Sequence, residues 1–140
     1  MQITNRRTQE SLECTLDTKP QGSGSKLSLL AGIKEVGHVV YGEQGSDLRI
    51  RWIENSMKST YKGVGSALID SLKNQCQQNP RLTSLSLCCM DEDSAVFFYN
   101  KGFRFDGEGA SSKNTLMDNL QQNPNFPMPD DVFLMGEMKA

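Results

Sequence analysis

Hydrophobic and polar positions alternate along the first 55 residues in a pattern typical of β-strands. In "SLECTLDT", Leu12, Cys14 and Leu16 alternate with mostly polar neighbours, and "PQGSGS" supplies a flexible break before the apolar "KLSLLAGI". "EVGHVVYGEQGSDLRIRWIEN" holds two further runs, separated by "GEQGSD", whose composition is typical of a hairpin connection. The pattern therefore predicts two strands joined by a loop, followed by two strands joined by a turn.

The last of these strands has two distinct faces if the two-residue repeat is unbroken. One face would then carry Leu48, Ile50, Trp52 and Glu54, and the other would carry Arg49, Arg51 and Ile53. On this prediction a carboxylate, Glu54, ends an otherwise apolar stripe.

The period changes after Gly63, where apolar residues begin to recur every three or four positions. The residues with this spacing are Val64, Ala67, Leu68, Leu72 and Cys76. Asn79-Pro80 ends the pattern, so it predicts an amphipathic helix between Gly63 and Asn79.

The remaining chain predicts a strand at "TSLSLCCM", a helix at "DEDSAVFFYNKGF", a short strand at "RFDGEG" and a last strand at "DVFLMGEMK". Asp91, Glu92 and Asp93 suit the positive start of that helix, and Gly102 suits its end. The long polar segment 107–130 has room for a small helix at "NTLMDNLQQN". Strand, helix, strand, helix and strand is an α+β or α/β order in which helices pack on a largely continuous sheet.

Composition narrows the class of protein. A chain of 140 residues with 36% hydrophobic content fits one globular domain over 1–140. A net charge of -2 without a basic patch argues against nucleic-acid binding, and no apolar stretch approaches membrane-spanning length. Four cysteines without CxxC spacing and a single histidine argue against metal fingers and disulfide scaffolds. We expect a cytoplasmic protein without a bound metal.

The stretch "TYKGVGSALID", residues 60–70, places two glycines directly before the predicted helix. A helix start binds anions because its first turn has unpaired N–H donors and the positive end of the helix dipole. A dinucleotide fingerprint would need a third glycine where Leu68 stands, and a P-loop would need a lysine after the glycines, whereas Lys62 precedes them. Taken alone, the stretch fits either a phosphate-binding loop or a simple turn.

Three features together resemble the GNAT superfamily of N-acetyltransferases, from about residue 35 to the end of the chain. Residues 60–65, "TYKGVG", match the family's [RQ]-x-x-G-x-[GA] loop at both glycine positions, with Thr60 in place of the leading Arg or Gln. "FFYNKGF", residues 97–103, is similar to the aromatic end of the family's next helix, and the order of elements follows the family's second half. The resemblance implies a GNAT-like acyl-CoA N-acyltransferase fold with a mixed, mostly antiparallel sheet flanked by helices.

The resemblance also implies acetyl-CoA, or another acyl-CoA, as co-substrate. Backbone amides of residues 61–66 would hold the pyrophosphate, and the pantetheine arm would lie beside the strand that ends at residues 53–55. The cofactor-binding residues that follow are Ile53, Asn55, Thr60, Tyr61, Lys62, Gly63, Val64, Gly65 and Ser66.

Acetyl transfer to an amine requires a base for the ammonium and an acid for the departing thiolate. Glu54 is the candidate base, and its alternative is a solvated glutamate at a strand end. The family's tyrosine acid stands four residues before the glycine of the GF pair, which here is Phe98, so either Tyr99 takes the role or the thiolate leaves without a tyrosine. His38 in its predicted strand is more typical of packing or surface than of a substrate contact.

The acceptor site departs from the family's pattern. Between its first two strands the family commonly has two helices, and this chain has only "KPQGSGS". The acceptor site is then open, closed by segment 107–130, or closed by a second copy in a homodimer. The sequence favours an N-acetyltransferase acting on a primary amine of a small molecule or protein. The alternative is a degenerate, non-catalytic GNAT domain that binds CoA or a partner protein.

Overall fold

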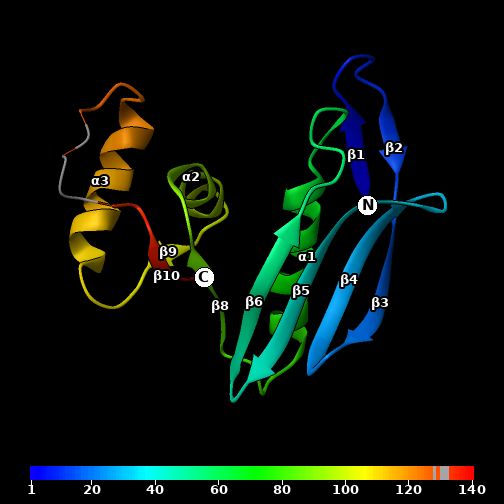
Figure 1. Cartoon of the computed structure of the whole chain (residues 1–140), viewed down its shortest axis with the longest axis horizontal. Coiled ribbons are helices and arrows are strands. Elements are labelled where there is room, and N and C mark those ends of the chain that lie inside the picture. The colour runs from blue at the N-terminus through cyan, green and yellow to red at the C-terminus, as the bar shows by residue number, and fades with distance from the viewer. Residues whose placement is uncertain (128, 130–132) are drawn as a thin grey trace. The chain divides into compact units, whose positions relative to one another are not determined.

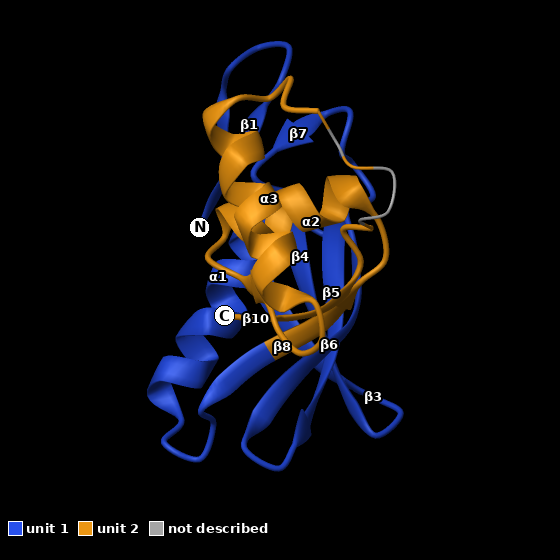
Figure 2. Cartoon of the chain, turned by 90° about the vertical axis from the view of Figure 1, so that its left-hand side faces the viewer, with its two compact units in different colours: residues 1–85 blue, residues 86–140 orange. Residues whose placement is uncertain are grey.

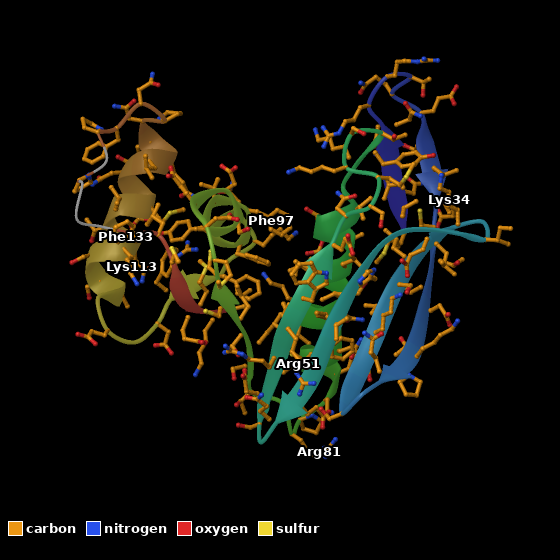
Figure 3. The ribbon with its side chains drawn as sticks, viewed as in Figure 1. Lys34, Arg51, Arg81, Phe97, Lys113 and Phe133 are labelled. Atoms are coloured by element: carbon orange, nitrogen blue, oxygen red, sulfur yellow. The ribbon has the colours of Figure 1, made fainter. Side chains whose placement is uncertain are left out.

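The computed structural model describes residues 1–127, 129 and 133–140. The chain divides into two compact units, Met1–Leu85 and Ser86–Ala140 (Figure 2). Each unit has strands and helices of its own, and both are mixed α/β structures in which the assigned strand pairs are antiparallel. The prediction of one domain over residues 1–140 is not tested by this division.

Four antiparallel strands in hairpin order form the main sheet of the first unit (Figure 1). They are β3 (Thr15–Gln21), β4 (Gly24–Ala31), β5 (Lys34–Gln44) and β6 (Asp47–Glu54). All three connections are two-residue turns, and each contains a glycine with positive φ, as two-residue hairpins require. Three of the four predicted strands are confirmed, whereas the predicted strand "SLECTLDT" is broken at Cys14, with only residues 15–18 in β3. "PQGSGS" is largely strand rather than a loop.

A second, three-stranded sheet in this unit was not predicted. β1 (Gln2–Asn5) pairs antiparallel with both β2 (Ser11–Glu13) and β7 (Tyr61–Lys62). Strand β1 is short and mostly polar. Its one buried apolar side chain, Ile3, cannot produce a repeating hydrophobic pattern in the sequence. The sheet joins the N-terminus to the residues directly before the first helix.

Helix α1 (Val64–Gln78) lies against one face of the main sheet (Figure 1). The predicted apolar stripe is buried at Val64, Ala67, Leu68 and Leu72, while Cys76 is partly exposed. Burial of this stripe against the sheet supplies most of the stability that a helix of this length lacks by itself. The predicted amphipathic helix is therefore confirmed.

The predicted faces of β6 are wrong, because the two-residue repeat is broken. Trp52 pairs with Val40 while Ile50 pairs with the next residue, Tyr41, so Arg51 is the extra residue of a β-bulge. Trp52 is 60% exposed, whereas Leu48 and Ile50 are buried. Arg51 and Trp52 are both exposed, and the bulge moves Trp52 and Glu54 off the apolar stripe that precedes them.

The second unit holds strands β8, β10 and β9 in antiparallel order, together with two helices. The bounds are β8 (Ser84–Cys89, beginning at the end of the first unit), α2 (Glu92–Asn100), β9 (Arg104–Phe105), α3 (Ala110–Gln122) and β10 (Gly136–Lys139). Helix α3 is longer than the predicted "NTLMDNLQQN". The last strand begins later than predicted, and residues 131 and 132 of that prediction lie outside the described residues.

Candidate functional site

The segment between β6 and α1 is an ordered loop held by hydrogen bonds. The Asn55 side-chain oxygen accepts from the Met57 N–H at 3.3 Å, and the Met57 carbonyl accepts from the N–H groups of Thr60 and Tyr61 at 3.0 and 2.9 Å. Tyr61 and Lys62 then form β7, which pairs with β1. These bonds fix the path of the chain from the end of β6 to the start of α1.

Gly63 opens α1 in a left-handed conformation, with φ 97°. A Cβ built on Gly63 would meet nothing within 4 Å, so the glycine serves the backbone angle and leaves open space beside the helix start. In this described part of the chain no side chain caps the helix, and its first turn contains no acidic residue. The first helical bond runs from the Ala67 N–H to the Gly63 carbonyl at 2.9 Å.

The N–H groups of Val64, Gly65 and Ser66 precede that first bond and point out of the helix start. Together with the helix dipole they can bind an anion such as a phosphate. Helix α3 begins in the same way at Gly109, φ 74° and without a side-chain cap, so this backbone geometry alone is not specific. What distinguishes α1 is the group of residues beside its start.

The N-terminal hairpin contacts the loop before α1 directly. The Arg6 side chain donates from Nε to the Lys58 carbonyl at 2.9 Å, and the Arg6 N–H donates to the Thr60 carbonyl at 2.9 Å. Lys58 and Lys62 are exposed on the same loop. Three basic residues therefore belong to, or bond to, the segment that leads into α1. Arg6 had no sequence signal for this role, because the contact joins residues 52 positions apart.

Gly37 on β5 brings the start of α1 close to the end of β6. A Cβ at Gly37 would lie 2.5 Å from Val64 Cγ1 and 2.9 Å from the Glu54 carbonyl oxygen, and real Cβ atoms do not approach that closely. The absence of a side chain at this position is what allows Val64 and the Glu54 backbone to pack against the same point. The start of α1 and the backbone of Glu54 are therefore packed near each other at Gly37.

Glu54 lies opposite His38 in the register of β5 and β6. Its carboxylate oxygen Oε2 is 3.7 Å from His38 Nε2, and its side chain is 52% exposed. The other ring nitrogen of His38, Nδ1, is 3.2 Å from Glu35 Oε2. His38 follows Gly37, which faces α1, so the imidazole and Glu54 lie on the face of the sheet away from that helix.

Glu35 is held by two further groups on β4. The Ser28 hydroxyl donates to Glu35 Oε1 at 2.6 Å, and Lys26 Nζ lies 3.2 Å from the same oxygen. The Ser28 hydrogen bond lowers the pKa of Glu35, with smaller contributions in the same direction from Lys26 and His38. Glu35 is therefore a carboxylate at neutral pH.

Tyr99, the candidate acid, lies in the second unit with 2% of its surface exposed. Its hydroxyl donates to the Asp118 carboxylate on α3 and lies 3.4 Å from the Asn114 carbonyl, and the Arg104 guanidinium lies 3.7 Å from its ring centre. Burial, followed by the Asp118 contact, raises the pKa of Tyr99. Its role as an acid stays a prediction. Phe98, at the family's tyrosine position, is a buried core residue.

One solved structure has a similar backbone over nearly the whole chain. It is described as an IAA acetyltransferase from Bacillus cereus ATCC 14579; the match has a TM-score of 0.61 and 13% sequence identity, and it covers 91% of this chain and 99% of the other. This chain has the fold of an acetyltransferase. No family model matches the sequence, and no curated protein is similar to it. At this identity the likeness concerns the fold.

The other sequence candidates occupy ordinary positions. On β8, Cys88 is exposed and Cys89 is buried, because adjacent residues of a strand point to opposite sides. Within the described residues, no three His, Cys, Asp or Glu side chains gather to hold a metal ion. No helix in the described ranges is both long enough and apolar enough to span a membrane.

The described residues of segment 107–130 contain a helix and a turn rather than one long loop. The helix is α3, and an open groove runs along it. The groove is lined by Ser111, Ser112, Thr115, Leu116, Asn119, Phe126 and Pro129. Residues 128 and 130 of the segment lie outside the described residues. A role of this segment in closing an acceptor site stays a prediction.

Proposed function

We propose that this chain is a GNAT-like N-acetyltransferase that transfers the acetyl group of acetyl-CoA to a primary amine of a small molecule or protein. The observation that carries the proposal is the junction at Gly37, where an uncapped helix start packs near the backbone of Glu54, whose carboxylate lies on the other face of the same sheet. The acetyltransferase fold of the solved neighbour supports the same reaction class. Neither the acceptor nor a homodimer is supported by a specific observation.

The start of α1 suits the pyrophosphate of acetyl-CoA. The N–H groups of Val64, Gly65 and Ser66 would donate to its oxygens, and the open space beside Gly63 leaves room for its approach. Lys62 would add a positive charge, while Thr60 and Tyr61 hold the loop through their bonds to Met57. Ile53 and Asn55 flank Glu54 at the strand end where the pantetheine arm would lie.

The thioester supplies an activated acetyl group when acetyl-CoA is bound. Glu54 would take a proton from the acceptor ammonium, because an amine attacks a carbonyl carbon only through its free electron pair. Its exposure of 52% leaves this carboxylate accessible to an acceptor. Tyr99 is the proposed donor to the departing thiolate, and its bond to Asp118 would have to be exchanged for that contact.

Binding and turnover are tested separately. Acetyl-CoA should raise the melting temperature, with about 2.7 kcal/mol of stabilisation at 100 times its Kd. A panel of small amines, polyamines, peptides and aminated antibiotics, followed by CoA release, should identify the acceptor. Glu54→Gln should lower kcat roughly 10²- to 10⁴-fold and leave the acetyl-CoA stabilisation intact.

Glu43→Gln on β5 is the matched control, because Glu43 is an exposed glutamate of the same sheet that pairs with Arg81 at 3.6 Å. It should change neither property. Absence of any stabilisation by acetyl-CoA would contradict the proposal. Stabilisation with no CoA release from any amine would instead show the non-catalytic binding module.

A further inference from the structure

His38, the only histidine of the chain, lies between two carboxylates from different parts of β5 and β6. Its side chain is 15% exposed, compared with 32% for Glu35 and 52% for Glu54. Glu54, His38 and Glu35 thus form an array of three side chains, in which the central imidazole is the least exposed. The charged groups that face this array are Lys26 from β4, Glu35 from β5 and Glu54 from β6.

The Glu35 side of the array determines where His38 carries its proton. Ser28 and Lys26 both approach Glu35 Oε1, which leaves Oε2 for His38 Nδ1 at 3.2 Å. An ionised carboxylate can only accept hydrogen bonds, so Nδ1 must be the donor in this contact. The hydrogen bond at one ring nitrogen sets the protonation of the other, and a neutral His38 then has its free electron pair on Nε2.

Nε2 faces the Glu54 carboxylate at 3.7 Å. This distance is longer than a direct hydrogen bond, and catalytic contacts are often long before the reacting complex forms. A proton on Glu54 would reach Nε2 after a small side-chain movement, because the exposed Glu54 side chain is free to rotate on the surface. The imidazole is thereby placed to receive a proton from that carboxylate.

We propose that His38 is a positioning residue for Glu54, held by Glu35 as the Nδ1–H tautomer so that Nε2 accepts the proton that Glu54 removes from the acceptor. This inference rests on the proposed function. The ammonium N–H bond breaks as an O–H bond forms on Glu54, and the electron pair remains on the amine. That O–H bond then breaks as an N–H bond forms at Nε2, and the imidazolium returns the proton to water.

The tautomer is tested without any substrate. Because the chain has one histidine, ¹⁵N imidazole signals of the full-length protein belong to His38 alone. In the neutral imidazole the proton should lie on Nδ1, and Nε2 should show the shift of an unprotonated ring nitrogen. Glu35→Ala should abolish this preference, while Glu43→Gln should leave the spectrum unchanged. A neutral imidazole with its proton on Nε2 in the parent protein would overturn the proposal, since that nitrogen could then accept no other.

Two substitutions separate positioning from simple packing. His38→Asn keeps an amide donor near the position of Nδ1, facing Glu35, but places nothing beside Glu54. It should lower kcat roughly tenfold with the KM for acetyl-CoA unchanged, and Glu35→Gln should give a smaller fall of the same kind. Full kcat in a folded His38→Asn, with folding checked by its melting temperature, would show a packing role and overturn the proposal.

Failure of the proposed function has a different signature. In that case the parent chain releases no CoA with any amine, and acetyl-CoA does not protect it from thermal unfolding. Failure of the inference leaves the parent active and stabilised by acetyl-CoA, with Nε2 protonated or with His38→Asn unimpaired.

Discussion

Helices α1 and α2 begin in opposite electrostatic conditions. At α2 the Asp91 side chain accepts from the Ser94 N–H at 2.8 Å, and Glu92 and Asp93 stand in the first turn. At α1 the first residue follows Gly63, with no side-chain cap and no acid in the first turn. At α2, carboxylates of the helix itself accept a hydrogen bond from its first turn and offset the positive end of its dipole. At α1, the same donors and the same positive potential are left for an external anion.

The two candidate catalytic side chains differ in a similar way. Glu54 in the first unit is half exposed, whereas Tyr99 in the second unit is buried and already bonded to Asp118. Polar groups that are already satisfied within a unit contribute to its stability. Polar groups left accessible are the ones that can act on another molecule. The difference suggests that the first unit carries more of the proposed chemistry than the second.

The largest expected effect is on acetyl-CoA binding, from filling the open start of α1 with a carboxylate. Ser66→Glu places a negative charge at the third helical residue, where repulsion of about 1–3 kcal/mol should weaken binding about 5- to 150-fold. The same charge should stabilise the free protein by about 0.3–1 kcal/mol through the helix dipole. Calorimetric titration and urea unfolding measure the two effects, which have opposite signs.

Ser112→Glu is the matched control, because Ser112 is the third residue of α3, which also begins at an uncapped glycine. It should stabilise the chain by a similar amount and leave the Kd for acetyl-CoA unchanged. Equal weakening of binding by both variants would contradict the assignment of the phosphate site to α1.

The next effect concerns the Tyr99 hydroxyl in the second unit, which is already hydrogen-bonded to Asp118. Tyr99→Phe removes the donor to Asp118 and should cost about 0.5–1.5 kcal/mol in the free energy of unfolding, because the hydrogen bond of a buried hydroxyl is lost while the exposed Asp118 carboxylate is left to water. Urea unfolding measures this cost. If Tyr99 is the acid, kcat falls as well; an unchanged kcat would show that the thiolate leaves without a tyrosine.

Removing the cap of α2 should have a similar effect, on stability alone. Asp91→Ala should lower the free energy of unfolding by about 1 kcal/mol, because the Ser94 N–H loses its acceptor. Asp93→Ala, which removes a charge in the first turn but no cap, should cost only a few tenths of a kcal/mol. Equal costs in urea unfolding would mean that the charge rather than the cap stabilises this helix start.

The last effect tests the polar groups behind His38; at pH 7 it is similar in size to that of the α2 cap, and it decreases as the pH falls. Ser28→Ala removes the largest contribution to the lowered pKa of Glu35 and should cost about 1 kcal/mol at pH 7. Because the folded pKa lies below the ordinary value of 4.5, this stability is present above that value and is lost as the pH falls through the folded pKa. Urea unfolding at pH 7 and pH 3 should show the difference between parent and variant shrinking. A constant difference would contradict a charged Glu35.

Periodic local signals in the sequence predicted three of the four hairpin strands, part of the fourth, and α1, because each element depends on residues a few positions apart. The cap of α2 was also visible, since Asp91 and Ser94 are neighbours on one turn. The loop glycines and the aromatic helix together indicated an acetyltransferase-like fold, which the solved neighbour supports. In these cases the cause lies within a short window of sequence.

Contacts between residues far apart in the sequence could be identified only from the tertiary structure. The bulge at Arg51 depends on pairing with β5, and it decides the face on which Glu54 lies. The His38–Glu54 contact depends on the same register, and the Tyr99–Asp118 bond depends on the packing of α2 and α3. The sequence by itself determined the open, glycine-led start of α1 and the residue types around it. Only the tertiary structure decided that a partly buried histidine stands behind Glu54, because strand register is set by long-range pairing and turns.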